Sequence, residues 1–278
     1  MRTQAIETAR RATKRQEKRA AAPASSSLTR MLAVFDAFSA AHPVLTAEEI
    51  MQRMGYSRGT VYRYVRELLA VGFLTRIAGG AYTLGPRIIE LDLAIRQCDP
   101  LLSAGAPIMH AMREKLQCDV LLTCFYEDRV VVTHHERGDD RITVSFGRGR
   151  VMPLFRGAPS KAIAAWLPPA RQKRLYADHP DEVRAAGLGA NWEEFKASLT
   201  ALRKQGHCVS HAELDPGNVG VAVPLNAEFP ASTRGSLALV FSRARYEIVD
   251  KGVVLEILLD AAAQASRKIN IPKGTWQS

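Results

Sequence analysis

The chain has 278 residues, of which 47 % are apolar and 24 % are charged. This composition is ordinary for a globular protein, and the length excludes a single small module and suits two domains. The formal net charge of +10 favours binding to a polyanion or to an anionic membrane surface.

The cysteines are Cys98, Cys118, Cys124 and Cys208. They form no Cys-x-x-Cys pair and no zinc-type cluster, so we expect reduced thiols and a cytoplasmic location. No long apolar run is present, which predicts neither a signal peptide nor a membrane span, and hence no membrane partner. An arginine-rich start can also mark an organelle transit peptide. Such peptides avoid acids, so Glu7 and Glu17 argue against this interpretation.

Residues 1–26 hold seven Lys or Arg against two acids, a net charge of +5. They end in a run of alanine, proline and serine, which predicts a basic, flexible arm. The arm either folds into a basic helix on a polyanion or remains a solvated tail. If it binds DNA, its deletion is expected to flatten the salt dependence of binding.

Three helices are predicted next. The apolar residues of 28–38 repeat at helical spacing, and Thr46 and Glu49 have the spacing of a capping box for a second helix that ends at Gly55. Ser57 is positioned to cap a third helix with its hydroxyl, and Gly72 lies where that helix stops. A helix, a short turn and a helix constitute a helix-turn-helix.

The third helix has an apolar stripe of Val61, Val65, Leu68 and Leu69. Basic, aromatic and hydroxyl side chains occupy its other face, as in a DNA recognition helix, although a charged face can also be merely solvated. Paired glycines at 79 and 80 predict a hairpin, or wing, between strands 73–77 and 82–84. The predicted DNA-binding residues are Ser57, Arg58, Thr60, Tyr62, Arg63, Arg66 and Arg76.

Residues 86–98 predict a helix that is apolar on more than one side and therefore packs against another subunit. We expect a break over 99–107 and a helix over 108–117. Strands are then predicted at 119–126, 129–135, 141–146, 207–212, 219–225 and 236–241, and helices at 158–167, 170–178, 181–186, 191–205 and 246–268. This mixture predicts an α+β domain.

Three stretches resemble the IclR family of transcription regulators. They are the segment 28–93, including Gly55 to Arg63, then Met152 to Ile163, and finally Gly206 to Glu213 with Val219 to Pro224. The resemblance implies a winged helix-turn-helix, a linker helix and a GAF-like effector-binding domain, assembled as a homodimer or homotetramer on double-stranded DNA. It also implies a small-molecule effector, expected to be a carboxylate or an aromatic acid from catabolism.

The resulting domain boundaries are 1–26 for the arm, 27–85 for the DNA-binding domain, 86–103 for the linker helix, 104–270 for the effector domain and 271–278 for a tail. Ser160, Gly220 and Arg156 depart from the family pattern. The predicted effector-binding residues are Phe146, Arg148, Met152, Arg156, Ser210, Glu213, Gly220, Ala222, Leu239 and Phe241. The arginines can equally be solvated, the phenylalanines can be core residues, and the register of 236–242 can shift by one.

A metal-binding or metal-sensing protein is the alternative, since His207, Cys208, His211 and Glu213 lie close in the sequence, and His134, His135 and Glu136 form a second group. On a strand, however, His207 and His211 are too far apart for easy joint ligation. No Gly-x-Ser-x-Gly elbow or Walker-type loop is present, so we expect no enzyme, no catalytic residue and no cofactor.

Overall fold

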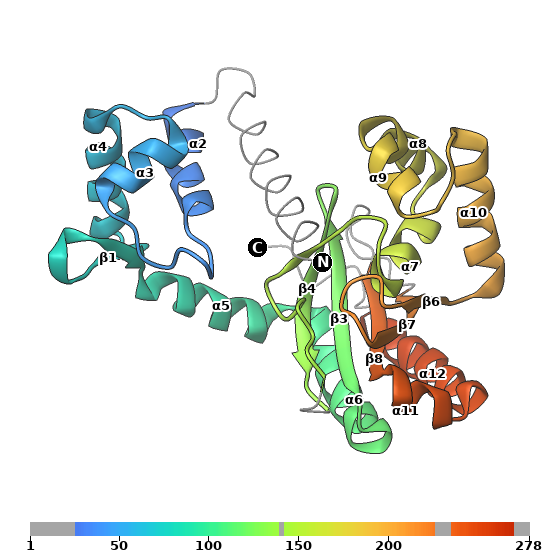
Figure 1. Ribbon diagram of the computed structural model, residues 1–278. Coiled ribbons are helices and arrows are strands. Elements are labelled where there is room, and N and C mark those ends of the chain that lie inside the picture. Colours follow the sequence, from blue (N-terminus) through green and yellow to red (C-terminus); the bar gives the residue numbers. More distant parts are fainter. Residues whose placement is uncertain (1–25, 139–141, 226–234, 270–278) are drawn as a thin grey trace. The chain divides into compact units, whose positions relative to one another are not determined.

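The computed structural model describes residues 26–138, 142–225 and 235–269. The chain divides into two compact units, Met1–Gln97 and Cys98–Ser278 (Figure 1). The predicted tail, and the predicted arm except for Ser26, lie outside the described residues. No helix among the described residues is both long enough and apolar enough to cross a membrane.

The first unit begins with α2 (Ser27–Leu32), a 3-10 helix η1 (Ala33–Ala37), α3 (Ala47–Met54) and α4 (Arg58–Ala70). The predicted continuous helix over 28–38 is therefore wrong: its second half is a 3-10 helix, and the side chains of Leu28 and Leu32 are exposed. The capping box of Thr46 and Glu49 is confirmed, and Gly55 ends α3 in the left-handed conformation.

The wing consists of β1 (Leu74–Arg76) and β2 (Tyr82–Leu84), joined through η2 (Ala78–Gly80). Gly79 and Gly80 both have a φ of 78°, which residues with a side chain rarely adopt. Leu45 pairs with Tyr82 and ties the wing to the helices. The unit is the predicted winged helix-turn-helix, followed by the predicted linker helix α5 (Pro86–Cys98).

The second unit starts with α6 (Pro100–Leu116), which Asp99 caps by accepting hydrogen bonds from the amides of Leu101 and Leu102. The predicted break over 99–107 is wrong, because Pro107 lies inside this helix. The helix packs on strands β3 (Asp119–Tyr126) and β4 (Arg129–Glu136). Burial of its apolar side therefore outweighs the hydrogen bond that the proline removes.

One six-stranded antiparallel sheet organises this unit, in the order β5-β4-β3-β8-β7-β6. The remaining strands are β5 (Val151–Met152), β6 (Cys208–His211), β7 (Asn218–Leu225) and β8 (Gly235–Ser242). The predicted strand over 141–146 is wrong: residues 142–146 form an irregular segment, and residue 141 lies outside the described residues.

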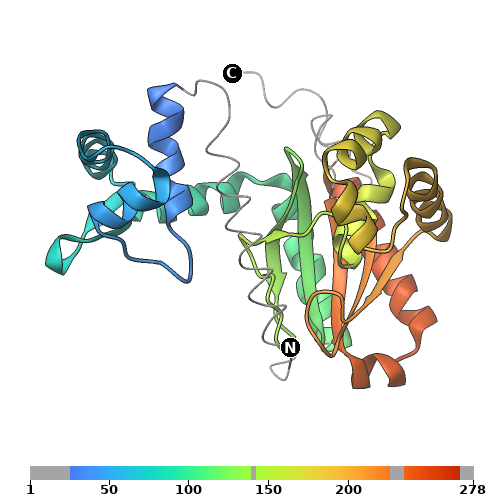
Figure 2. The same cartoon turned by 45° about the horizontal axis from the view of Figure 1, so that its top comes forward.

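Helices cover both faces of the sheet (Figure 2). One face packs on α6 and α12 (Lys251–Ile269), and the other packs on α7 (Ala158–Trp166), with α8 (Pro169–Asp178), α9 (Pro180–Ala185) and α10 (Trp192–Gln205) beyond it. The single helix predicted over 246–268 is wrong, because α11 (Arg243–Ile248) ends before α12 begins.

Candidate functional site

Helical spacing places the apolar and the polar residues of α4 on opposite faces of the helix. Val61, Tyr64, Val65 and Leu68 are buried in the core of the first unit. Positions 58, 59, 62, 63 and 66 repeat at intervals of three and four, so they share the opposite face. On this face the side chains of Arg58, Tyr62, Arg63 and Arg66 are exposed. Ser57, before the helix, and Arg76, on β1, are also exposed, whereas Thr60 is half-buried.

The start of α4 differs from expectation. The hydroxyl of Ser57 caps no amide; it lies 3.0 Å from the hydroxyl of Thr60. Arg58 lies over the ring of Tyr62, with 5.4 Å between its guanidinium carbon and the ring centroid. Arg66 pairs with Glu67 at 2.9 Å, an exposed contact of small energetic value that a phosphate can replace. The exposed face therefore offers cations, a hydroxyl and an aromatic ring to a polyanion.

A cavity that is open to solvent lies in the second unit, on the face of the sheet that α7 covers; its volume is about 410 Å³ when the solvent at its mouth is included. Its apolar lining comes from strands β3, β5 and β8, from the start of α7 and from two loops. The lining residues are Leu121, Val144, Phe146, Met152, Pro159, Ser210, Glu213, Leu214, Asp215, Asn218, Gly220 and Val240. A pocket that is mostly apolar, with a few polar groups, suits a small organic molecule.

Five of the predicted effector-binding residues line this cavity, namely Phe146, Met152, Ser210, Glu213 and Gly220. Ala222 lies on the same face of the sheet but is packed in the core. The placement expected for Leu239 and Phe241 is wrong, because both are buried on the opposite face, with α6 and α12. Val240 lines the cavity instead, which is the one-residue shift in register that the sequence left open.

Neither predicted arginine lines the cavity. The guanidinium of Arg148 donates to the backbone carbonyl of Thr133, and that of Arg156 donates to the backbone carbonyl of Glu213. Sequence reasoning assigned no role to Lys161, whose ammonium lies 2.5 Å from the Glu213 carboxylate. It also missed Asp215 and Asn218, although Asp-Pro-Gly-Asn over 215–218 is a turn pattern that could have placed both beside the sheet.

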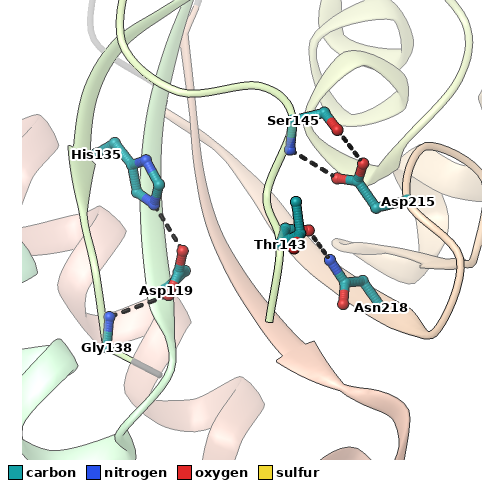
Figure 3. A network of polar contacts seen from close by, with 7 residues as sticks. All are labelled: Asp119, His135, Gly138, Thr143, Ser145, Asp215 and Asn218. Atoms are coloured by element: carbon teal, nitrogen blue, oxygen red, sulfur yellow. Dashed lines mark hydrogen bonds and ion pairs between the residues drawn. The ribbon is translucent and has the colours of Figure 1, made fainter. Parts of the chain in front are cut away.

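Polar contacts hold the loops around the cavity (Figure 3). The carboxylate of Asp215 accepts hydrogen bonds from the amide and the hydroxyl of Ser145, and the side-chain amide of Asn218 donates to the carbonyl of Thr143 at 2.9 Å. These contacts join residues more than 65 positions apart in the sequence. They fix the irregular segment that carries Val144 and Phe146 against the turn between β6 and β7.

A buried histidine–carboxylate pair lies on the same face of the sheet (Figure 3). Nε2 of His135 lies 2.7 Å from Oδ2 of Asp119, and Oδ1 of Asp119 accepts from the amide of Gly138 at 3.0 Å. Both side chains are less than 10 % exposed. The pair therefore ties β3 to the end of β4, a contact that burial makes costly to break.

The structure does not gather the residues of the metal-binding alternative. Cys208 is buried on the cavity face, whereas His211 points away and contacts Tyr246. His207 interacts with Gln205. Across the described ranges, no group of three or more His, Cys, Asp or Glu is arranged to hold a metal ion, so this alternative has no structural support.

The cysteines fall into two groups. Cys98 is exposed, and the other three are buried. Burial raises the pKa of Cys118, Cys124 and Cys208 to about 12, and at Cys208 the nearby Lys161 partly opposes this shift. A thiol with such a pKa stays protonated and unreactive at neutral pH.

Comparison with known proteins identifies the class. The model of the IclR helix-turn-helix domain matches residues 27–78, and that of the bacterial transcriptional regulator IclR C-terminal domain matches residues 95–267. These matches cover both units and define a helix-turn-helix transcription regulator. The chain belongs to the IclR family.

Relatives agree over most of the chain. The HTH-type transcriptional regulator KipR of Bacillus subtilis is 26 % identical over 230 residues, which is 82 % of this chain and 90 % of KipR. An IclR homolog from Microbacterium hydrocarbonoxydans, solved with 4-hydroxybenzoate, shares the fold with a TM-score of 0.71 at 20 % identity, covering 88 % of this chain and 99 % of that one. An IclR-family regulator from Brucella abortus has a TM-score of 0.72 at 19 % identity, covering 89 % and 96 %.

Proposed function

We propose that the chain binds operator DNA through the exposed face of α4, and that a small molecule in the cavity of the second unit sets its affinity for DNA. The observation that carries this proposal is the division of α4, whose apolar side is buried while Arg58, Tyr62, Arg63 and Arg66 are exposed on the other side. Membership of the family supports the DNA-binding role.

The residues have separate roles in this proposal. Arg63 reads a guanine edge with its guanidinium, a bidentate contact that discriminates between bases. Ser57, Arg66 and Arg76 hold phosphates, which positions the helix without reading sequence. Arg58, Thr60 and Tyr62 complete the contact surface.

The test is an Arg63→Ala titration on an operator selected from random-sequence DNA and on a scrambled duplex. The variant is expected to lose about 1–3 kcal/mol of binding free energy on the operator and much less on the scrambled duplex. Arg243→Ala is the matched control, because it removes an exposed, ion-paired arginine from the second unit. Equal losses on both duplexes would contradict base reading by Arg63.

A homodimer or homotetramer is part of the proposal. None of the described side chains of α5 is buried, and Ile89, Leu93 and Ile95 are each more than half exposed. Apolar groups gain free energy when a second copy covers them. We therefore expect Ile89→Asp with Leu93→Asp to shift the sedimentation coefficient toward the monomer, and unchanged sedimentation would remove α5 from the interface.

Effector control requires reciprocal coupling. If α5 transmits the state of the effector domain, the ligand changes DNA affinity by the same factor as DNA changes ligand affinity, typically about 1–3 kcal/mol. A carboxylate or an aromatic acid is the class that the family resemblance implies, and the 4-hydroxybenzoate complex of the Microbacterium homolog supports it. A thermal-shift screen finds the ligand, and calorimetry with and without DNA tests the coupling.

A further inference from the structure

The irregular segment 142–146 forms one wall of the cavity, and we refer to it as the strap. Its side chains alternate in character. Those at positions 142, 144 and 146 are apolar, half-buried and packed on the core, whereas those at 143 and 145 are polar and exposed. Val144 and Phe146 line the cavity. The strap therefore presents an apolar side to the cavity and a polar side to solvent.

The strap is attached to the sheet at two distant places. Just beyond its end, the amide of Gly149 donates to the carbonyl of Val132 on β4 at 2.8 Å. On the other side, the strap is bonded to Asp215, in the turn between β6 and β7, and to Asn218, at the start of β7 (Figure 3). Strands β3 and β8 lie between β4 and β7 in the sheet. The strap therefore crosses over these two strands.

The floor of the cavity lies beneath this crossing. Leu121 on β3 and Val240 on β8 line the cavity, yet they are only 2 % and 9 % exposed. The mouth is open to solvent, but side chains that are covered so closely leave no space beside them for a ring-sized molecule. A ligand reaches this floor only if part of the wall moves. The strap is the part of the wall best suited to move, since irregular segments open more easily than core strands and helices.

Exposed contacts hold the strap in place. The carboxylate of Asp215 accepts hydrogen bonds from the amide of Ser145 at 3.0 Å and from its hydroxyl, and the side-chain amide of Asn218 donates to the carbonyl of Thr143 at 2.9 Å. Water competes for these groups, so each bond contributes only modest net stability. The half-buried apolar side chains add only part of their transfer free energy. Such a segment can open while the rest of the unit stays folded.

We propose that the strap is a gate, which opens when Asp215 and Asn218 release it and which controls how fast a small molecule reaches the floor of the cavity. Ser145, Asp215 and Asn218 are positioning residues in this proposal, because they act on a ligand through the strap. Access to the cavity is a property of the second unit alone. Its consequence for regulation rests on the effector role proposed above.

The test measures access to a thiol beneath the strap. Val240→Cys introduces this thiol at the cavity floor, and the full-length protein is treated with iodoacetamide, a small neutral reagent, without effector or DNA. Peptide mass spectrometry distinguishes the introduced thiol from the native cysteines. Cys124 is buried on the opposite face of the sheet, so its alkylation reports unfolding of the unit.

Release of the strap is expected to accelerate the reaction. When Asp215→Ala is added to Val240→Cys, the introduced thiol is expected to react about tenfold faster or more, the factor that follows from losing a hydrogen bond to a charged group. Ser145→Ala keeps the bond from the backbone amide and is expected to give a smaller increase. The rate at Cys124 is expected to stay unchanged in both variants.

Three comparisons separate a gate from a cavity that is merely larger. Asp215→Asn keeps the size of the side chain and one acceptor oxygen, so it is expected to give an intermediate rate. Adding Ser145→Ala to Asp215→Ala is expected to give no further increase, because the serine hydroxyl has already lost its partner. Asp181→Ala is the matched control, since it removes an exposed, ion-paired carboxylate from α9 and is expected to leave the rate unchanged.

The proposal is overturned if the introduced thiol reacts as fast in the folded Val240→Cys protein as in urea, because the floor is then freely accessible. It is also overturned if Asp215→Ala leaves the rate unchanged, if Cys124 accelerates by the same factor, or if the Ser145 and Asp215 effects multiply. Leu121→Cys provides a second thiol on the same floor if circular dichroism shows that Val240→Cys is unfolded. Because the assay contains neither effector nor DNA, failure of every ligand to change operator affinity would count against the proposed function alone.

Discussion

The helices α4 and α7 begin in opposite ways. At α4, Ser57 leaves the amides uncapped by its side chain, and the nearby arginines are exposed. At α7, the amide of Gly157 donates to the Glu213 carboxylate and the amide of Ala158 donates to the Ser210 hydroxyl. The adjacent Lys161 pairs with the same glutamate. A helix start favours negative charge in both places. The start of α4 can accept an anion from another molecule, whereas the start of α7 is already bonded to a carboxylate and a hydroxyl of its own unit. The same preference for negative charge therefore serves two different roles.

Among the substitutions that test this comparison, Gly157→Ala is expected to change the free energy of unfolding the most. Its φ is +85°, and a Cβ there would lie 2.6 Å from Cδ1 of Leu214. Gly157→Ala is therefore expected to lower the free energy of unfolding of the second unit by about 2 kcal/mol or more. Gly149→Ala is the matched control, since its φ is +80° with nothing within 4 Å, and backbone strain alone costs about 1–2 kcal/mol.

Urea unfolding followed by circular dichroism measures both variants. If they lose the same stability, the close contact with Leu214 carries no cost, and the start of α7 is less constrained than its hydrogen bonds indicate. If Gly157→Ala loses more, the position of the amide opposite Glu213 depends on the absence of a side chain.

A smaller effect is expected at Gly59 on α4. A Cβ there would meet nothing within 4 Å, so Gly59→Ala is expected to raise the stability of the first unit by about 1 kcal/mol through helix propensity. It shares the face of Arg63, where a methyl group would separate the backbone from DNA. We expect a higher Tm together with weaker operator binding in a fluorescence titration; stronger binding would place Gly59 away from the DNA.

The smallest effect is expected from Glu49 in the capping box of α3. Hydrogen bonds from the backbone amide of Thr46 and then from its hydroxyl lower the pKa of Glu49. A lowered folded-state pKa gives stability that is present above the ordinary pKa of a glutamate and is lost as pH falls through the lowered value. Glu49→Gln is expected to reduce the loss of stability of the first unit between neutral and acid pH; an unchanged pH profile would contradict this.

Local features were predictable from the sequence, and distant pairings were not. Thr46 with Glu49 and Gly79 with Gly80 act within a few residues, so their residue types alone indicate the structure. The Glu213–Lys161 and Asp119–His135 contacts join different elements, and no spacing in the sequence reveals them.

The wrong placement of Leu239 and Phe241 has a physical reason. Seven of the eight residues of β8 are buried, because helices cover both faces of the sheet. Apolar and polar residues then do not alternate, so nothing in the pattern distinguishes the face of Leu239 from that of Val240. The break predicted over 99–107 was wrong for a different reason. A proline usually ends a helix, but Pro107 lies within one that packs on the sheet.

The strand order of the sheet has a consequence for synthesis of the chain. Its central pair joins β3 to β8, so that Leu121 lies opposite Ala238. The ribosome must therefore release more than a hundred further residues before β3 gains this neighbour, and until then one of its edges is exposed. The first unit needs no residue beyond its own segment for its core. It can fold on the nascent chain long before the second unit closes its sheet.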